Sequence, residues 1–297
     1  MIDKLEMFIV LANERHFGRA ALAIGITQPS LSSGIKQLED QLGVQLVRRG
    51  SRFQGLTPEG QRVLEWARRI VSDARTMREE MRAARTGLSG NLRIGVIPTA
   101  LPMVADLVDP FARRHPNVRV IILSRSSVEI LSQIETLELD AGLSYLANEP
   151  LGRVTAMPLF NESYCLLVHA GAPVAGAEAI GWAEAAAQPL CLLTGDMQNR
   201  RIVNARMQRV GEAASPRIES NSLVALVAHV MTGHWASIVP LKMARIFARD
   251  PRLRAIPICP ETDAGEPVGL IAAHREPHTP VLAALLDMAR RISEIPG

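Results

Sequence analysis

Residues 16–60 read HFGRAALAIGITQPSLSSGIKQLEDQLGVQLVRRGSRFQGLTPEG, and this stretch decides the fold of the N-terminal part of the chain. Thr27 is a good helix N-cap, and Pro29 stands in the first helical turn, where its missing N–H costs nothing. Apolar residues then recur at helical spacing and predict one buried face, made of Leu31, Ile35, Leu38 and Leu42. A short Ala-rich helix over residues 19–24 precedes them and ends at Gly25. The segment therefore predicts helix, tight turn and second helix.

The outward face of the second helix carries small or flexible polar side chains, which suit base edges and phosphates. A polar helix face alone is most often merely solvated. Here, however, basic residues follow it around a Gly-Ser turn and predict a basic wing. The residues predicted to contact DNA are Arg19, Thr27, Gln28, Pro29, Ser30, Ser33 and Lys36 of the two helices, with Arg48, Arg49 and Arg52 of the wing.

The charge of the chain is unevenly divided. Residues 1–90 hold 14 Lys and Arg against 10 Asp and Glu, a net charge of +4, whereas the remainder of the 297 residues carries a net charge of −1. Phosphate contacts need positive charge beside the helix-turn-helix. Because the excess is modest, the placement of individual basic residues matters more than the total.

A long helix follows the wing. Thr57, Pro58 and Glu59 supply an N-cap, a first-turn proline and an acid favoured by the helix dipole, and Gly87 stops the helix after about Thr86. Apolar residues along it alternate steps of four and three, as in a heptad seam: Val63, Ala67, Ile70, Ala74, Met77, Met81, Ala84 and Leu88. The alternative is a helix packed on its own domain. Charged residues crowd the other faces, so we interpret the six residues from Val63 to Met81 as a dimerisation seam.

Three segments resemble the N-terminus of the LysR-type transcriptional regulators: MIDKLEMFIVLANERHF (1–17), GRAALAIGITQPSLSSGIKQLEDQLGVQLVRRG (18–50) and LTPEG (56–60). The length and organisation of the chain extend the resemblance over all of it. The resemblance implies a winged helix-turn-helix, a long dimerising linker helix and a two-lobed effector domain similar to periplasmic binding proteins. It also implies an operator in double-stranded DNA, a small-molecule effector, RNA polymerase and further copies of the chain, as a homodimer or homotetramer, as partners. Members often carry Ser or Thr near the start of the second helix, whereas this chain has His16, Phe17 and Gly18.

Beyond a short hinge at Ser89–Asn91 the pattern changes to strands alternating with helices, which predicts an α/β domain with a mainly parallel sheet. Strands are predicted over 92–97, 118–123, 139–146, 154–160, 164–169, 190–193, 236–239 and 267–274. Helices are predicted over 101–115, 128–137, 197–210, 223–232 and 281–292. The predicted division is 1–58 for the winged helix-turn-helix, 59–88 for the linker helix, 89–161 plus 268–297 for lobe I, and 162–267 for lobe II. Two crossings between the lobes predict a hinged cleft.

In open parallel sheets, ligands bind outside the carboxyl ends of strands, and helix N-termini there favour anions. The resemblance places effector contacts at the same turns. The predicted effector-binding residues are Thr99, Ala100, Ser126, Ser127, Asn199, Arg200, His234 and Trp235. Hydroxyls and an arginine indicate a small carboxylate or other anion, and the bulk of His234 and Trp235 indicates a small pocket. The alternatives are helix capping for the hydroxyls, solvent exposure for Arg200 and core packing for Trp235.

Other functions find little support in the sequence. It lacks the common nucleotide-binding, metalloprotease and serine-hydrolase motifs, so we expect no enzyme, no metal and no cofactor. Cys165, Cys191 and Cys259 are odd in number and far apart, and are interpreted as reduced thiols, with a redox switch as the alternative. With no apolar run of 18 residues and no leader pattern, we expect a cytoplasmic protein without a membrane segment. A solute-binding protein with an unrelated N-terminal extension and an enzyme acting on the cleft ligand remain the rival hypotheses.

Overall fold

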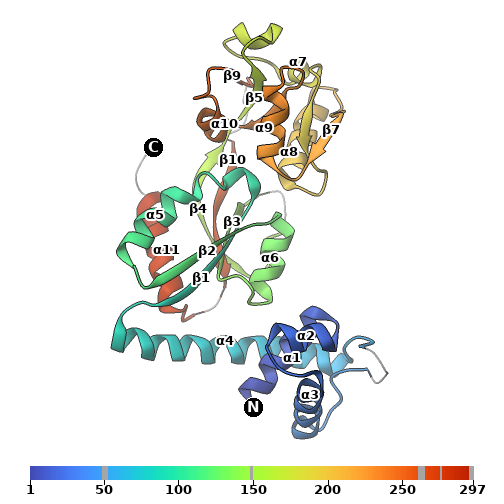
Figure 1. Ribbon diagram of the computed structural model, residues 1–297, viewed down its shortest axis with the longest axis vertical. Helices are drawn as coiled ribbons and strands as arrows, with labels where there is room; N and C mark the ends of the chain where they lie inside the picture. The colour runs from blue at the N-terminus through green and yellow to red at the C-terminus, as the bar shows by residue number, and fades with distance from the viewer. Residues whose placement is uncertain (49–52, 148–149, 260–264, 275, 294–297) are drawn as a thin grey trace. The chain divides into compact units, whose positions relative to one another are not determined.

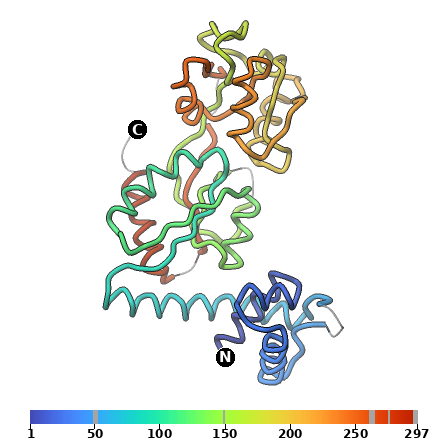
Figure 2. Tube along the Cα trace, viewed as in Figure 1, coloured from blue at the N-terminus to red at the C-terminus, as the bar shows by residue number. Residues whose placement is uncertain are grey.

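The computed structural model describes residues 1–48, 53–147, 150–259, 265–274 and 276–293. The chain forms two compact units. The first comprises residues 1–89 with the short segments 135–138 and 275–283, and the second comprises the rest. Figure 1 shows their helices and strands, and Figure 2 follows the same course as a Cα tube.

The first unit is helical and has an apolar core. Its helices are α1 (Ile2–Glu14), α2 (Phe17–Ala23), α3 (Gln28–Leu42) and α4 (Pro58–Thr86). Phe8 of α1 and Leu31 and Leu38 of α3 expose no surface, and Leu64 of α4 closes the same core. An antiparallel bridge between Val47 and Leu56 joins the two arms of the wing. The structure therefore confirms that the predicted helix-turn-helix forms.

Side chains at the helix ends explain where these helices begin. The Thr27 hydroxyl accepts the N–H of Ser30 at 3.3 Å, and the Thr57 hydroxyl accepts the N–H of Gly60 at 2.9 Å. At the start of α2, where the family often has Ser or Thr, the His16 ring accepts instead: its Nδ1 lies 3.2 Å from the backbone nitrogen of Arg19. The imidazole thus supplies the cap that a hydroxyl would give.

Two features of the first unit differ from the sequence prediction. Leu42, predicted on the buried face of α3, is 39% exposed because the helix ends there and Gly43, at φ 69°, turns the chain away. Ala67, predicted in the dimer seam, is fully buried inside this chain, since the first half of α4 packs on α1. Val63 packs partly against the same core.

The second unit contains the strands. They are β1 (Gly90–Val96), β2 (Val118–Ser124), β3 (Ala141–Tyr145), β4 (Val154–Glu162), β5 (Tyr164–His169), β6 (Cys191–Leu193), β7 (Ile218–Ser220), β8 (Ser237–Pro240), β9 (Leu253–Pro257) and β10 (Glu266–Ala273). The helices that follow β1 along the chain are η1 (Pro98–Ala100), α5 (Val104–Arg114), α6 (Ser127–Glu135), η2 (Pro173–Gly176), α7 (Trp182–Ala186), α8 (Gln198–Arg209), α9 (Leu223–Met231), α10 (Leu241–Phe247) and α11 (Pro280–Ser293).

The strands form two lobes. Lobe I is the sheet β2-β1-β3-β10-β4, in which β1 pairs in parallel with β2 and β3, while β10 runs antiparallel to β3 and β4. Lobe II holds the antiparallel sheet β8-β5-β9 and the parallel pair β6-β7. Helices α5 and α6 cover opposite faces of the lobe I sheet (Figure 1). The approach of α6 is close, because a Cβ on Gly142 would meet Ile130.

The chain crosses between the lobes twice. It leaves lobe I at the end of β4, passes through Ser163 and enters lobe II with Tyr164 of β5. It returns from β9 to β10, which takes a central place in lobe I. The predicted strand and helix ranges agree with these elements to within a few residues, whereas the short elements α7, β7, α10 and β9 are absent from the sequence prediction. No helix in the described part of the chain is long and apolar enough to cross a membrane.

Candidate effector site and DNA-binding surface

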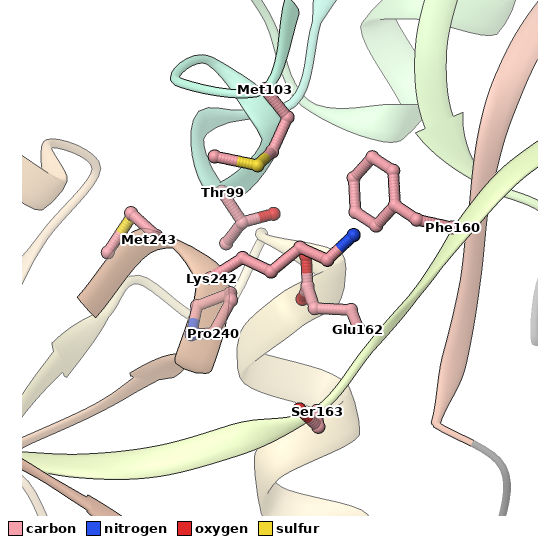
Figure 3. Close-up of a pocket in the computed structure, with 8 residues that line it drawn as sticks. All are labelled: Thr99, Met103, Phe160, Glu162, Ser163, Pro240, Lys242 and Met243. Carbon is pink, nitrogen blue, oxygen red and sulfur yellow. The ribbon is translucent and has the colours of Figure 1, made fainter. Parts of the chain in front are cut away.

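A pocket lies where the two lobes meet, beside the first crossing strand (Figure 3). It is lined by Thr99, Met103, Phe160, Glu162, Ser163, Pro240, Lys242 and Met243. Thr99 comes from the turn after β1, which is the carboxyl end of a parallel strand, as the sheet rule predicts. The wall is mostly apolar, and Thr99, Glu162 and Lys242 supply a hydroxyl, a carboxyl and an ammonium group.

Glu162 is the centre of a buried hydrogen-bond network. The hydroxyl of Tyr145 donates to Glu162 Oε1 at 2.5 Å, and the hydroxyl of Tyr164 lies 3.2 Å from the same oxygen. Thr99 Oγ1 lies 3.2 Å from the Tyr145 hydroxyl. The second carboxyl oxygen, Oε2, is buried and has no hydrogen-bond partner among the described residues. The two oxygens of this carboxyl therefore differ in how well they are satisfied.

Asn199, near the start of α8, adds lobe II to this network. Its Nδ2 lies 3.2 Å from the hydroxyl oxygen of Tyr145 and 3.4 Å from that of Tyr164. Tyr145 belongs to β3 of lobe I and Tyr164 to β5 of lobe II. Glu162, at the crossing itself, is thus hydrogen-bonded to both lobes. A ligand that disturbs Glu162 would act on contacts that hold the lobes together.

Burial sets the charge of these groups. Removal from water raises the pKa of Glu162 to about 7, although the hydroxyls of Tyr145 and Tyr164 oppose the rise by hydrogen bonding to the carboxylate. Burial likewise holds the pKa values of both tyrosines well above 10, so they remain hydrogen-bond donors. At the rim, the Lys242 ammonium lies 4.7 Å from the centroid of the Phe160 ring and remains exposed. The pocket therefore combines a titratable carboxyl with a cation.

The predicted effector residues are only partly brought together. Thr99 lines the pocket, Ala100 is buried beside it, and Asn199 joins the network. Ser126 does not line the pocket. It caps α6 through a capping box, in which its backbone N–H donates to Glu129 Oε2 at 2.8 Å while its hydroxyl accepts the N–H of Glu129. Ser127 is buried in the first turn of the same helix, also outside the pocket lining.

Three predicted effector residues have other roles in this structure. Arg200 is buried and already bound, because its guanidinium donates to Asn204 and to the Leu193 carbonyl and pairs with Glu219. Trp235 packs on the core of lobe II, and His234 is exposed. Both precede β8, whose other end, Pro240, lines the pocket. Trp235 lies five positions before Pro240, about 16 Å along an extended chain, and neither Trp235 nor His234 lines the pocket.

Sequence reasoning missed the groups that dominate the pocket. Glu162 is an acid just before a predicted strand, at the point where the chain is expected to change lobes. That combination is a usable signal. The sequence around Lys242 carries no such signal, because nothing near it distinguishes it from an ordinary exposed lysine. The sequence predicts Tyr145 and Tyr164 only as strand residues.

The predicted DNA-contacting residues of α3 are accessible. Gln28, Ser30, Ser33 and Lys36 are all exposed. Thr27 Oγ1 and Ser30 Oγ lie 2.8 Å apart, and Gln37 Nε2 donates to Ser33 Oγ at 3.3 Å. Pro29 is also exposed in the first turn. These contacts orient side chains of the polar face.

The basic residues around α3 are placed differently from one another. The Arg19 guanidinium holds the end of α1, with Nε 3.2 Å from a carboxylate oxygen of Glu14. Arg48 is exposed, and its backbone N–H donates to the Gly55 carbonyl across the wing. Arg49 and Arg52 lie outside the described residues. Contact with DNA stays a prediction for all of these residues.

Beyond Ala67, the predicted seam on α4 is open in the single chain. Ile70, Met77 and Met81 are exposed, and so is Trp66 on the same face. Ala74 is half-buried. That a second copy of the chain covers this stripe stays a prediction.

Two of the three cysteines are buried and one is exposed. Burial raises the pKa of Cys165 to about 12 and that of Cys191 to about 11, so both remain protonated thiols. Cys259 is exposed, and none of the three forms a disulfide. Within the described residues, no group of three or more His, Cys, Asp or Glu could hold a metal ion.

Comparison with known proteins agrees with this architecture. The family model of the LysR substrate binding domain matches residues 85–293, and that of the bacterial regulatory helix-turn-helix protein, lysR family, matches residues 2–61. A hydrogen peroxide-inducible genes activator from Pectobacterium carotovorum subsp. carotovorum is 29% identical over 251 residues, which cover 84% of this chain and 83% of the relative. The HTH-type transcriptional regulator XapR from Escherichia coli (strain K12) is 35% identical over 161 residues, 54% of this chain and 55% of XapR.

Solved structures share the fold along the chain. A cysteine-to-aspartate variant of full-length OxyR from Pseudomonas aeruginosa matches with a TM-score of 0.77 and 26% identity, covering 100% of this chain and 99% of OxyR. Full-length CbnR complexed with target DNA has a similar fold, with a TM-score of 0.63 and 24% identity over 98% of this chain and 99% of CbnR. With both family models matching and the fold shared along its length, the chain belongs to the LysR family of DNA-binding transcriptional regulators.

Proposed function

We propose that this regulator binds an operator in double-stranded DNA through α3 and the wing, and that a small carboxylate in the inter-lobe pocket controls it. The observation that carries the effector class is the pocket itself: an apolar wall with Thr99, Glu162 and Lys242 at one place. We further propose that the chain works in the cytoplasm as a homodimer or homotetramer. RNA polymerase is a partner by analogy with the family.

The groups in the pocket suit a short carboxylate with an apolar body. The Lys242 ammonium can donate to the carboxylate, and charge-assisted bonds of this kind are the strong ones. Met103, Phe160 and Met243 can pack against the rest of the molecule. The pocket is small, so we propose a small effector.

The position of the pocket supports regulation rather than mere binding. A ligand shifts a conformational equilibrium only if it binds one state better than the other. A carboxylate here would contact Thr99 in lobe I, Lys242 in lobe II and Glu162 at the crossing. Its affinity therefore depends on the angle between the lobes, which gives it the differential affinity that allostery requires.

A peroxide response is the second candidate, because several relatives are named as hydrogen peroxide-inducible genes activators. Thiol-based sensing needs a reactive thiolate. Cys165 and Cys191 are buried with raised pKa values, and Cys259 is a single exposed thiol. These features do not favour it, and we propose a non-covalent effector.

The test is calorimetric binding of acetate, propionate and butyrate to the full chain. Lys242→Met removes the ammonium but keeps most of the stem, and we expect it to weaken binding at least tenfold. Arg254→Met, which removes an exposed cation from β9 of the same lobe, serves as the matched control and should bind like the parent. Equal affinity for the parent and Lys242→Met would mean that the carboxylate does not sit in this pocket.

A further inference from the structure

One helix of lobe II, α8, reaches across to lobe I with its first turn. Gln198 and Asn199 are 4% and 5% exposed. Gln198 Nε2 donates to the backbone carbonyl of Ala147, just beyond β3 of lobe I, at 2.8 Å. Asn199 Nδ2 lies 3.2 Å from the hydroxyl oxygen of Tyr145 in β3. The start of α8 is therefore tied to lobe I.

The same helix is tied to the second crossing between the lobes. Arg206 follows Asn199 by seven residues, so both lie on one face of α8. Its Cζ lies 5.8 Å from the centroid of the Tyr164 ring and 6.0 Å from that of the Trp182 ring, both in lobe II. From there its Nη2 donates to Glu266 Oε1 at 2.8 Å. Glu266 begins β10 and pairs with the last residue of β4, so α8 contacts the place where both crossing strands meet.

These contacts between the lobes are incompletely satisfied. Gln198 Oε1, Arg206 Nε and Glu162 Oε2 are buried and have no hydrogen-bond partner among the described residues. Each of these atoms costs free energy while it stays dry, and water can satisfy it once the lobes part. Parting the lobes also breaks the bonds to Ala147, Tyr145 and Glu266. Gains and losses therefore oppose each other, as they must in a contact that both forms and breaks.

We propose that Gln198, Asn199 and Arg206 form a releasable lock between the lobes, which we call the α8 lock. While it is closed, the lobes keep the arrangement of this structure. When it opens, they move about the two crossings. The inference does not depend on the chemistry of the effector. Because Thr99 and Lys242 come from different lobes, opening the lock would also widen the pocket between them.

A second buried arginine of α8 allows a matched comparison. Arg200 and Arg206 are each 7% exposed, and each forms an ion pair. The partner of Arg200 is Glu219 of β7, inside lobe II, whereas the partner of Arg206 is Glu266 of β10, in the lobe I sheet. Loss of either arginine removes a buried ion pair from the same helix. The pair of Arg206 joins the lobes, and that of Arg200 does not.

The distance between the lobes, measured by pulsed electron paramagnetic resonance, tests the lock in the full chain without effector. Nitroxide labels at Arg114→Cys on α5 and Glu184→Cys on α7, both exposed, report from lobe I and lobe II. Cys259→Ser removes the exposed native thiol. Labelled protein is mixed with excess unlabelled protein, so that each oligomer holds one labelled copy.

We expect Arg206→Met to raise the population outside the main distance of the parent about tenfold, because a hydrogen bond between charged groups is lost and Glu266 keeps no cation. Gln198→Met, which removes one neutral hydrogen bond to lobe I, should raise it about threefold. Arg200→Met should give the distances of the parent.

Two results would overturn the lock. One is a parent-like distance distribution in Arg206→Met. The other is an equal shift in Arg200→Met, which would mean that a loosened helix, rather than a broken contact between the lobes, moves the labels. Circular dichroism checks that each variant folds. If Arg206→Met does not fold, Gln198→Met decides: a shifted distribution supports the lock, and a parent-like one refutes it. Neither result bears on carboxylate binding, which is measured separately.

Discussion

At the scale of single residues, the charge of Glu162 carries most of the chemistry. The surrounding protein removes it from water, satisfies one of its oxygens with two tyrosine hydroxyls and leaves the other unpaired. A carboxyl in such a place costs free energy whenever it ionises. This cost should be visible in the stability of the protein.

We predict that Glu162→Gln is less destabilised by rising pH than the parent. The folded pKa, about 7, lies above the ordinary value of 4.5, so the folded state binds more protons than the unfolded state between these values. The parent should lose up to about 3 kcal/mol of stability across that window, at about 1.4 kcal/mol per pKa unit, and no more above it. Thermal unfolding of the parent, Glu162→Gln and the control Glu178→Gln at pH 5 and pH 8 measures the difference. A gap between parent and Glu162→Gln that does not change with pH would contradict the account.

Gln28 is the residue of α3 for which we predict a direct base contact. It is exposed in the first turn, and a Gln side chain can pair with a base edge through two hydrogen bonds. Gln28→Ala should cost about 1–3 kcal/mol on the preferred operator and relax the preference at one base position. Competition binding against single-base variants of the operator measures this, and an unchanged preference would show that Gln28 does not read a base.

Arg48→Ala provides the contrast in the same assay. Arg48 is exposed in the wing, where we predict a phosphate contact. Its loss should weaken binding to all sequences alike and reduce the salt slope by about 1.

Residue-scale prediction from the sequence succeeded where the cause is local. Thr27 and Thr57 cap helices because their own backbone neighbours need an acceptor, and a sequence displays that directly. For Arg200 and Trp235 the structure shows partners that the local sequence does not display: Glu219 for the arginine and the lobe II core for the tryptophan. Glu162 was missed for the same reason, since the tyrosines that surround it are brought in by the sheets.

At the scale of elements, the two halves of α4 have different surroundings. Its first half packs on α1 and contributes Leu64 and Ala67 to the core of the first unit. Further along, Ile70, Met77 and Met81 stay exposed. The heptad spacing correctly marked an apolar stripe, but spacing alone cannot say which part of a stripe is covered by the same chain. The short elements α7, β7, α10 and β9 are absent from the sequence prediction.

We predict that Met77→Glu converts the oligomer to monomers. The substitution would place an unpaired carboxylate in an apolar interface, which is costly to bury. Gln61→Glu adds the same charge on the opposite face of α4, where the side chain is exposed, and is the matched control. Light scattering coupled to gel filtration measures the mass of each. An oligomer of unchanged mass for Met77→Glu would place the dimer contact elsewhere.

At the scale of the whole molecule, a DNA-binding unit, a long helix and a two-lobed domain make up one regulator. The order of these three parts could be predicted from the sequence, because charge, heptad spacing and strand–helix alternation each change along the chain. The site between the lobes was predictable only as a region, through the turn that carries Thr99. Its chemistry depends on residues from both lobes and both sheets, which no local pattern brings together.

The central claim is that copies of this chain read a specific DNA sequence together. Repeated selection of bound duplexes from a random DNA library by the full-length protein tests it most directly. We predict enrichment of a partly palindromic site whose half-sites lie about 10 base pairs apart, or a multiple of that, because two α3 helices must enter successive major grooves on one side of the duplex. Recovery of no common sequence, or of a single half-site without a second copy at fixed spacing, would contradict it.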